Sequence, residues 1–269
     1  LFSDVELSYI SNNISLLSSH LLKNPTDMAL RKATSTTDGD LLLLVNSTDG
    51  SLATYSILRG QNVIAPSLST TDGTFEKVGV DVDQIYFVVK RTINSATKYY
   101  VECFNDDNTT DSSKLLSGSS KPSTTTVTGL SHLEGKTVKV IADDSMQNDK
   151  TVSSGQITLD AVPTTYVEIG LDYTPEVKTL PVELKLSSGN IVAQKKRIIE
   201  ATCNLYLSQN LTLNGKDFLF TVGSGEFFTG KKRRKPMLGF DREGQMTFSQ
   251  SSPLFFTLLG VEYKVSVGQ

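Results

Sequence analysis

The sequence predicts a mostly β protein, made of propeller-like antiparallel hairpins with a small inserted β-barrel and a short N-terminal helix. Residues 85–89 form a run of β-branched and aromatic side chains, and residues 98–104 resume this pattern after a polar break, which indicates a hairpin. Asp-Gly steps at residues 38, 49 and 72 are strong turn signals. The chain is also rich in Ser and Thr and modest in apolar residues, at 38%, and this composition favours strands and turns over helices.

Residues 3–22 are the best candidate for a helix. Ser3 is followed three positions later by Glu6, which has the form of a capping box, and Pro25 would end the helix. Four further residues lie at helical spacing: Leu16, Leu17, His20 and Leu21. We therefore expect one short helix ahead of the β region.

The β region is expected to begin near residue 28 and to consist of successive strand–turn–strand units. Residues 41–45 and 51–58 form the first unit, and the hairpin at 83–104 forms another. Units of this kind resemble the blades of a β-propeller, although no exact repeat occurs. Both sides of the strand at 85–89 are apolar, so we expect this strand to be covered on both faces.

We expect the chain to have four parts. Residues 195–207 alternate between apolar and polar side chains, which favours a half-buried strand, and residues 245–248 and 263–267 are expected to be closing strands. The parts are residues 1–104 (helix plus propeller-like β region), 105–128 (a polar linker or long exposed loop), 129–162 (a small β-barrel-like unit) and 163–269 (a C-terminal β region that completes the larger fold).

Bulk composition narrows the classes of function. The 269 residues carry a net charge of -3, so charge alone gives no reason to expect nucleic-acid binding. No apolar run is long enough to span a membrane, and only two histidines occur, which argues against a His-rich metal site. Cys103 and Cys203 are expected to be buried free thiols. The chain begins with Leu1 rather than Met, which suggests a fragment or a processed product.

Several motifs occur in a recognisable order and spacing. They are FEKV at 75–78, QIYFVVKRTIN at 84–94, YYVE at 99–102, LSHLEGKTV at 130–138, VEIGLDY at 167–173, KTLP at 178–181, KKRI at 195–198, LYLS at 205–208, SPL at 252–254 and LLGV at 258–261. Together they resemble the C-terminal part of tail nozzle (tail tubular) proteins of short-tailed bacteriophages, and the resemblance spans most of the chain. The chain departs from related sequences in having no Trp, which those sequences often carry in the propeller-like hairpins.

The resemblance implies a non-enzymatic structural subunit of a virion, located in the distal tube of the phage tail. Nozzle proteins form a ring, typically of six copies, below the tail adaptor, and the ring encloses the channel through which DNA leaves. The implied partners are further copies of the chain, the tail adaptor protein, tail fibres, and double-stranded DNA in transient passage. A gate at the distal end would hold the genome until the host is met. The resemblance implies no cofactor, no metal and no catalytic residue.

The most conspicuous charge feature is a basic run that is expected to lie on a loop. It consists of Lys231, Lys232, Arg233, Arg234 and Lys235. Such a run can contact DNA phosphates, dock on an acidic patch of the next subunit, or simply keep a loop solvated. Tight phosphate contacts would slow DNA ejection, so we favour a solvated loop or a subunit contact.

Other polar groups are more typical of turns and packing than of functional sites. Asp106-Asp107-Asn108, and Asp143-Asp144 with Asp149, lack the spacing of a calcium-binding EF-hand loop and read as turn acids. Ser131 and His132 could form a hydrolase triad with Asp143 or Asp144, but no Gly-x-Ser-x-Gly motif surrounds a serine here. Gly223-x-Gly225 has no strand–helix context for a dinucleotide site.

Two further functions stay open at this point. A carbohydrate-binding or depolymerising tail module would need an exposed aromatic platform or a paired-acid cleft. Tyr99 and Tyr100 could supply the platform in the absence of Trp, and Glu200 with Glu226 could supply the acids. A secreted β-sandwich adhesion domain would instead be a monomer without a ring partner.

Overall fold

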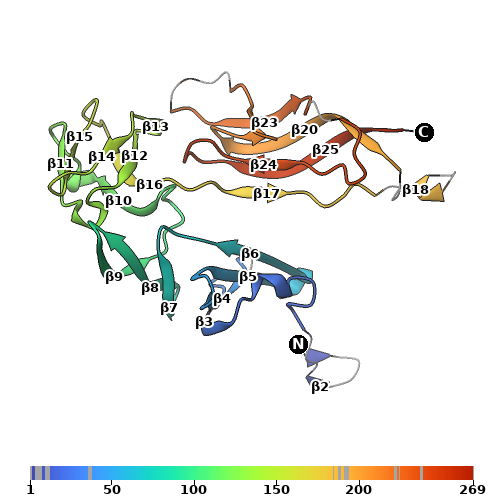
Figure 1. Cartoon of the computed structure of the whole chain (residues 1–269), viewed down its shortest axis with the longest axis horizontal. Coiled ribbons are helices and arrows are strands. Elements are labelled where there is room, and N and C mark those ends of the chain that lie inside the picture. The colour runs from blue at the N-terminus through green and yellow to red at the C-terminus, as the bar shows by residue number, and fades with distance from the viewer. Residues whose placement is uncertain are drawn as a thin grey trace. The chain divides into compact units, whose positions relative to one another are not determined.

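The computed structural model of the protein describes residues 2–3, 8–9, 13–35, 38–183, 185–186, 189–190, 194–220, 223, 225–236 and 239–268. Figure 1 shows that these residues form antiparallel sheets joined by loops and short 3₁₀ turns. The mostly β class is therefore confirmed. The chain divides into two compact units, Leu1–Asp106 and Asp107–Gln269. None of the described helices is long and apolar enough to cross a membrane.

The first unit contains two antiparallel sheets in which consecutive strands are neighbours. Their orders are β3-β4-β5-β6 and β7-β8-β9, which confirms the expected hairpins, including the one at 83–104. The elements are β1 (Phe2–Ser3), β2 (Ser8–Tyr9), η1 (Ser19–Leu21), β3 (Pro25–Arg31), β4 (Asp40–Asn46), β5 (Leu52–Leu58), η2 (Arg59–Gln61), β6 (Val63–Ser69), β7 (Thr74–Asp81), β8 (Gln84–Ile93) and β9 (Ala96–Cys103). The turn between β8 and β9 consists of Asn94 and Ser95, both with positive φ, as a tight hairpin turn requires.

The two sheets of the first unit share one hydrophobic core. Leu43 and Val45 of β4 share one hydrophobic core with Phe87 and Val89 of β8. The other face of β8 is open, because Tyr86 is exposed there. The expectation that this strand is covered on both faces is therefore wrong, since only one sheet packs against it within the described residues.

The expected N-terminal helix is also wrong. The described part of residues 3–22 contains two short strands, a turn and the single 3₁₀ turn η1, while residues 4–7 and 10–12 lie outside the described residues. Asn13 Oδ1 accepts a hydrogen bond from the backbone N–H of Ser15 at 2.9 Å, and such side-chain bonds compete with helix formation. Leu17, one of the residues at helical spacing, is 92% exposed.

The second unit begins with a small β unit that has its own core. Its main sheet has the order β10-β16-β12-β13, with β14 also paired to β12, and β11 pairs with β15. The described residues show no closed barrel. The elements are β10 (Asp111–Ser117), η3 (Gly118–Ser120), β11 (Thr126–Thr128), η4 (Ser131–Leu133), β12 (Thr137–Ala142), β13 (Ser145–Met146), β14 (Lys150–Thr151), β15 (Gln156–Thr158) and β16 (Tyr166–Leu171).

This small unit is larger than the sequence predicted. The stretch at 105–128, expected to be a linker or loop, contains β10 and β11. The strand β10 forms because its backbone pairs with β16, which does not require apolar side chains. The strand β16 was expected in the C-terminal region, but it is a central strand of this sheet, and its Val167 and Ile169 lie in the same core as Val140.

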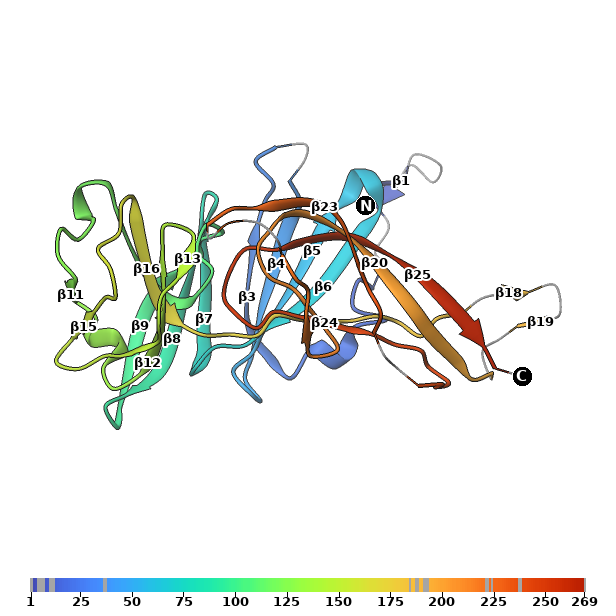
Figure 2. The ribbon, with the colours of Figure 1, turned by 90° about the horizontal axis from the view of Figure 1, so that it is seen from above.

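The rest of the second unit consists mainly of two sheets around a common core. Their orders are β23-β20-β25 and β17-β24-β21-β22, and Figure 2 shows β20 and β25 running side by side. The strands are β17 (Glu176–Lys178), β18 (Lys185–Leu186), β19 (Gly189–Asn190), β20 (Lys196–Ser208), β21 (Thr212–Leu213), β22 (Lys216–Asp217), β23 (Phe228–Arg234), β24 (Thr247–Ser249) and β25 (Thr257–Val267). The half-buried strand at 195–207 and the closing strands are thus confirmed.

The two cysteines are both free, as expected, but only one of them is buried. Cys203 lies in the core of the second unit, and burial raises the pKa of its thiol to about 11. Cys103 is exposed at the end of β9. The expectation of two buried thiols is therefore wrong for Cys103, which lies on the open face of its sheet.

Gly170 on β16 allows the start of β10 to approach closely. A Cβ atom at this position would lie 2.3 Å from Thr110 Oγ1 and 2.8 Å from the carbonyl oxygen of Asp111. Real side chains do not tolerate such distances, so any larger residue has to push the two strands apart.

We expect Gly170→Ala to lower the free energy of unfolding by about 2–3 kcal/mol, because it overpacks the contact between β10 and β16. Denaturant unfolding followed by tyrosine fluorescence measures this change. Gly260→Ala in β25 is the matched control, because a Cβ there meets nothing within 4 Å, and its effect is expected to stay within about 0.5 kcal/mol. Equal effects of the two substitutions would contradict the prediction.

Candidate functional site

The basic run lies on strand β23 and not on a loop, so that expectation is wrong. Arg234 pairs with Ala201 and Lys232 with Cys203, on the neighbouring strand β20. Side chains of a strand alternate between its two faces, so the run is divided between the inner and the outer face of the sheet. Lys235 follows directly after the strand and is exposed.

The inner members of the run contact aromatic rings. Lys232 Nζ lies 4.9 Å from the ring centre of Phe220 and 4.6 Å from that of Phe228, and it also donates a hydrogen bond to the carbonyl oxygen of Leu219. The guanidinium group of Arg234 lies 5.8 Å from the ring centre of Phe218. These contacts are cation–π interactions, and they stabilise the strand.

The outer members of the run face acids of the same sheet. Lys231 Nζ lies 2.6 Å from Glu262 Oε1, and Arg233 Nη1 lies 3.7 Å from Glu200 Oε1. All of these side chains except Glu200 are well exposed, so each pair contributes little to stability. The outer face of β23 is therefore a mixed surface of cations and acids that can dock on a charged partner but does not form a uniform cationic track.

We expect Lys232→Ala to lower the free energy of unfolding by about 1–2 kcal/mol, because it removes two ring contacts. Lys231→Ala is the matched control, and its effect is expected to stay within about 0.5 kcal/mol, since its ion pair is exposed. Denaturant unfolding of both variants measures the difference. A larger loss for Lys231→Ala would overturn the division of the run into two faces.

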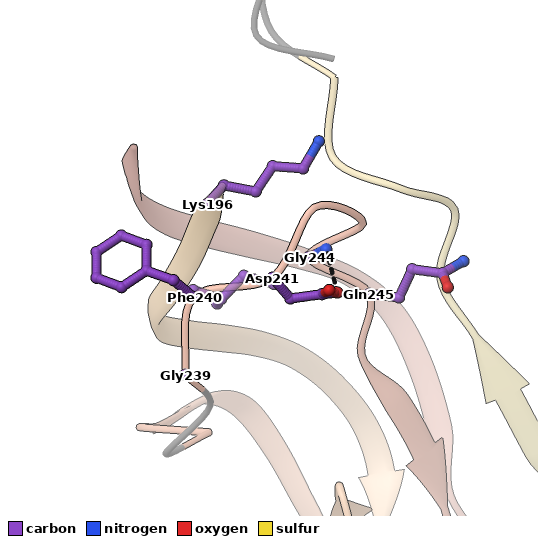
Figure 3. Close-up of a pocket in the computed structure, with 7 residues that line it drawn as sticks. Lys196, Gly239, Phe240, Asp241, Gly244 and Gln245 are labelled. Atoms are coloured by element: carbon purple, nitrogen blue, oxygen red, sulfur yellow. Dashed lines mark hydrogen bonds between the residues drawn. The ribbon is translucent and has the colours of Figure 1, made fainter. Parts of the chain in front are cut away.

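A hollow in the second unit lies at the start of β20. Its volume is about 240 Å³, and its lining includes Lys196, Phe240, Asp241 and Gly244 (Figure 3). Lys196 is buried, and its ammonium group donates to the carbonyl oxygen of Val182. The Asp241 carboxylate accepts backbone N–H groups of its own turn, including that of Gly244 at 3.2 Å, and these bonds lower the pKa of Asp241. Both charged groups therefore hold the local backbone.

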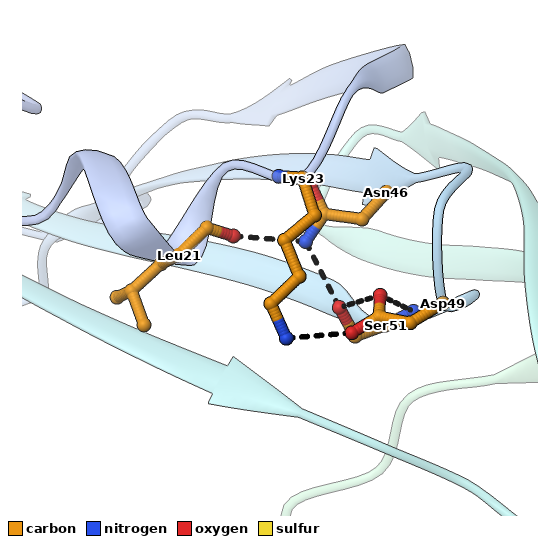
Figure 4. Close-up of polar contacts among 5 residues, drawn as sticks. All are labelled: Leu21, Lys23, Asn46, Asp49 and Ser51. Atoms are coloured by element: carbon orange, nitrogen blue, oxygen red, sulfur yellow. Dashed lines mark hydrogen bonds and ion pairs between the residues drawn. The ribbon is translucent and has the colours of Figure 1, made fainter.

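A second polar cluster lies in the first unit, around the turn between β4 and β5 (Figure 4). The buried Asn46 side chain accepts from the N–H of Lys23 and donates to the carbonyl of Leu21 and to Ser51, all at 2.9 Å. Lys23 Nζ lies 2.6 Å from Asp49. The hydrogen bond from Lys23, followed by that from Ser51, lowers the pKa of Asp49 to about 2. This cluster fastens residues 21–23 to the sheet.

The hydrolase candidates are held in other contacts. Asp143 accepts hydrogen bonds from the backbones of Thr164 and Thr165 at 2.6 and 2.7 Å. Burial alone would raise the pKa of Asp143, but these bonds outweigh it and lower the pKa. Asp144 accepts from the hydroxyl of Tyr166 at 2.7 Å, and His132 Nε2 lies 3.2 Å from the carbonyl oxygen of Ser112. The two acids therefore shape a turn.

The remaining candidates do not come together either. The described residues contain no group of three or more metal-ligating side chains, and Asp149 lies 2.9 Å from Lys139. Glu226 accepts the N–H of Gly223 at 2.9 Å, whereas Glu200 faces the basic strand. Tyr99 and Tyr100 point to opposite faces of β9, because neighbouring residues of a strand alternate, so they cannot form one stacking platform.

Sequence reasoning missed the three charged residues that are buried within the described part of the chain. Arg91 and Glu168 lie in the apolar runs of β8 and β16, and Lys196 begins β20. A signal was present for Arg91, because it continues the inward-facing series Phe87 and Val89 at a spacing of two. A charge at such a position needs a partner inside the protein.

No protein-family model matches this chain, and a search of curated proteins finds no match either. The class that the fold and these contacts define is therefore a mostly β protein with several antiparallel sheets.

Proposed function

We propose that the chain is a structural, non-enzymatic subunit of a phage tail nozzle, which forms a ring around the DNA exit channel, retains the genome and lets it out on host contact. The observation that carries the proposal is the place of the resemblance motifs in the fold. The motif at 84–94 lies on β8, the one at 167–173 includes most of β16, and those at 195–198 and 205–208 lie on β20. These strands supply the three hydrophobic cores, as expected for a family whose role is to build a scaffold.

The structural use of the charged groups supports the same proposal. The acids and bases considered above bind backbone groups, rings or one another, and each contact stabilises a turn or a strand. We also propose that the two sheets of the first unit are propeller-like blades, and that the small unit around β12 and β16 is a barrel-like module. The proposed partners are further copies of the chain in a ring, typically six, the tail adaptor, tail fibres and passing double-stranded DNA.

The outer cations of β23 are proposed to contact a neighbouring subunit rather than DNA. Lys231 and Arg233 each face an acid of their own sheet, and a mixed surface of this kind suits docking between proteins better than it suits tight phosphate binding. Replacing Lys231, Arg233 and Lys235 together by Gln is expected to leave binding to duplex DNA unchanged in a filter assay. A large loss of DNA binding would reverse this assignment.

The experiment that tests the function is electron microscopy of source virions labelled with an antibody against this chain. Label confined to the distal tail tube, below the adaptor, is the expected result, and particles lacking the chain are expected to leak DNA. Label on fibres or spikes would replace the proposal by a glycan-binding tail module. The absence of label from all particles would overturn the virion location.

A further inference from the structure

The first sheet carries an exposed apolar patch on the face that points away from the core. Met28 pairs with Leu44, and Leu30 pairs with Leu42, so all four side chains lie on one face, opposite to Leu43. Met28 is 69% exposed and Leu30 is also exposed, while the two leucines of β4 are half-buried. We call Met28, Leu30, Leu42 and Leu44 the β3–β4 patch.

Among the described residues, this face is covered only in part. Ser18 Oγ donates to the hydroxyl of Tyr55 at 3.1 Å, and Tyr55 is buried, so the segment around Ser18 lies over β5. The β3–β4 patch stays open beside it. A hollow of about 320 Å³, lined by Pro25, Thr26, Asp27, Met28 and Leu44, borders the patch and gives room for an inserted side chain.

The second sheet carries a matching patch on its own outer face. Val88 pairs with Val101, and Tyr86 and Tyr99 lie on the same side of the two strands. Val101 is 76% exposed and Tyr99 is 62% exposed. We call Tyr86, Val88, Tyr99 and Val101 the β8–β9 patch. Its most exposed side chains project from the edge strand β9, where they are free to enter a hollow.

The two patches lie on opposite outer faces of one stack of two sheets, because the inner faces of these sheets share the core around Val45 and Phe87. One copy of the chain therefore cannot bring its own patches together. A second copy can cover both kinds of patch with one kind of contact, and that contact repeats the sheet-on-sheet packing that already joins the first sheet to the second within each copy. An interface between unlike patches is heterologous, so it extends to rings or filaments.

Charge favours contact between unlike patches over contact between like ones. Lys77 pairs with Val88, and Lys90 pairs with Tyr99, so both cations border the β8–β9 patch on its own face. Asp81 pairs with Gln84 and also lies on this face, which leaves the face with a net positive charge. Asp40 lies on the face of the β3–β4 patch, two residues before Leu42. Contact between two β8–β9 patches would bring two net positive faces together, each with two cations and one acid, whereas contact between unlike patches sets this net positive face against Asp40.

We propose that the β8–β9 patch of one copy packs on the β3–β4 patch of the next copy, so that copies of this chain join head to tail. The inference rests on the self-assembly included in the proposed function and names the surfaces that would carry it. Val101 or Tyr99 enters the hollow beside Met28. An open assembly then has one free patch at each of its two ends until the ring closes.

Two substitutions in the full 269-residue chain test the contact. Met28→Glu blocks the β3–β4 patch, and Val101→Glu blocks the β8–β9 patch. Both sites are exposed, so the fold is expected to survive, which circular dichroism checks. Leu259→Glu is the matched control, because Leu259 is an exposed leucine on β25, outside both patches.

The measurement is sedimentation velocity over a range of protein concentrations. We expect the unmodified chain and Leu259→Glu to self-associate, and each patch variant alone to associate about 30-fold more weakly or worse, the effect of losing an interface hot spot. An equimolar mixture of the two patch variants is expected to form dimers and nothing larger, because each variant keeps one intact patch and these two are complementary.

Three results would overturn the proposal. If the patch variants assemble as the unmodified chain does, this contact is refuted while the self-assembling function stands. If the mixture stays monomeric, or if only one of the two variants loses assembly, the contact is not between unlike patches. If the unmodified chain is monomeric at its highest soluble concentration, this contact fails, and the labelling of virions then decides separately whether the tail location stands.

Discussion

Glu102→Ala is expected to lower the free energy of unfolding of the first unit by about 3–5 kcal/mol, the usual effect of leaving a buried charge without its partner. Arg91 is 1% exposed, and its guanidinium group binds both carboxylate oxygens of Glu102 at 2.7 Å. The same group donates to the carbonyl of Asp72 at 2.9 Å. Without Glu102, the positive charge stays inside the core without its carboxylate partner.

Denaturant unfolding of the variant measures this loss of stability, and two further variants test whether the unpaired charge causes it. Lys98→Ala is the control, because Lys98 is exposed and lies opposite Arg91 in the same pair of strands, and its effect is expected to stay within about 0.5 kcal/mol. The double substitution Arg91→Met with Glu102→Leu is expected to recover most of the stability, since apolar residues can replace a buried ion pair. A double variant as unstable as Glu102→Ala would show that packing, not charge, determines the effect.

Glu168→Ala is expected to lower the free energy of unfolding of the second unit by about 3 kcal/mol, because it leaves two buried backbone donors without acceptors. The Glu168 carboxylate accepts the N–H of Thr109 at 2.9 Å and that of Thr110 at 2.7 Å, and both threonines are buried. Denaturant unfolding again measures the change. Glu168→Gln keeps an acceptor oxygen at this position and is expected to lose less than half as much, so equal losses would contradict the role given to these two bonds.

The same carboxylate is expected to make stability depend on pH. Burial raises the pKa of Glu168 above its ordinary value of 4.5, although hydrogen bonds from Thr110 and Thr109 oppose the shift. Between 4.5 and the raised pKa, the folded state holds the proton more tightly than the unfolded state does. The contribution of Glu168 to the free energy of unfolding therefore falls as the pH rises through this window.

Unfolding experiments across this window, on the unmodified chain and on Glu168→Gln, isolate the effect. The difference in stability between the two is expected to shift in favour of the Gln variant as the pH rises. Asp49 and Asp143 have lowered pKa values, so their contribution to the free energy of unfolding falls as the pH drops below their ordinary value of 3.8. This contribution is the same in the unmodified chain and in Glu168→Gln, and it cancels in the difference. A difference that does not change with pH would refute the buried carboxylate as its source.

The sequence predicted those strands whose faces differ in polarity. The strand β20 alternates along its length between apolar and polar side chains, and the hairpin at 83–104 consists of two runs of β-branched and aromatic residues around a polar turn, so local pattern was enough. The basic strand β23 could not be found this way, because Lys232 and Arg234 are as polar as the residues between them. The side chains of Lys232 and Arg234 lie on the inner face, where they contact the rings of Phe220 and Phe218. No local sequence pattern predicts these contacts.

Other errors have the same physical origin. The strand β10 consists largely of polar residues, and it forms through backbone pairing with β16, far along the chain. The expected helix had the correct spacing of leucines, but Leu17 has no core to enter. For the candidate sites, the acids of residues 143–144 were correctly interpreted as turn residues, while the buried partners Arg91 and Glu168 required knowledge of the tertiary contacts.

The hydrogen bonds of Glu168 also limit the length of the segment that connects the two units. On one side, the N–H of Phe104 bonds to the carbonyl of Ile85. On the other, the carboxylate holds Thr109 and Thr110 against β16. The tether between these anchor points is residues 105–108, so a pull on either unit reaches the other after very little slack. Loss of the anchor at Thr109 would lengthen this tether before any sheet comes apart.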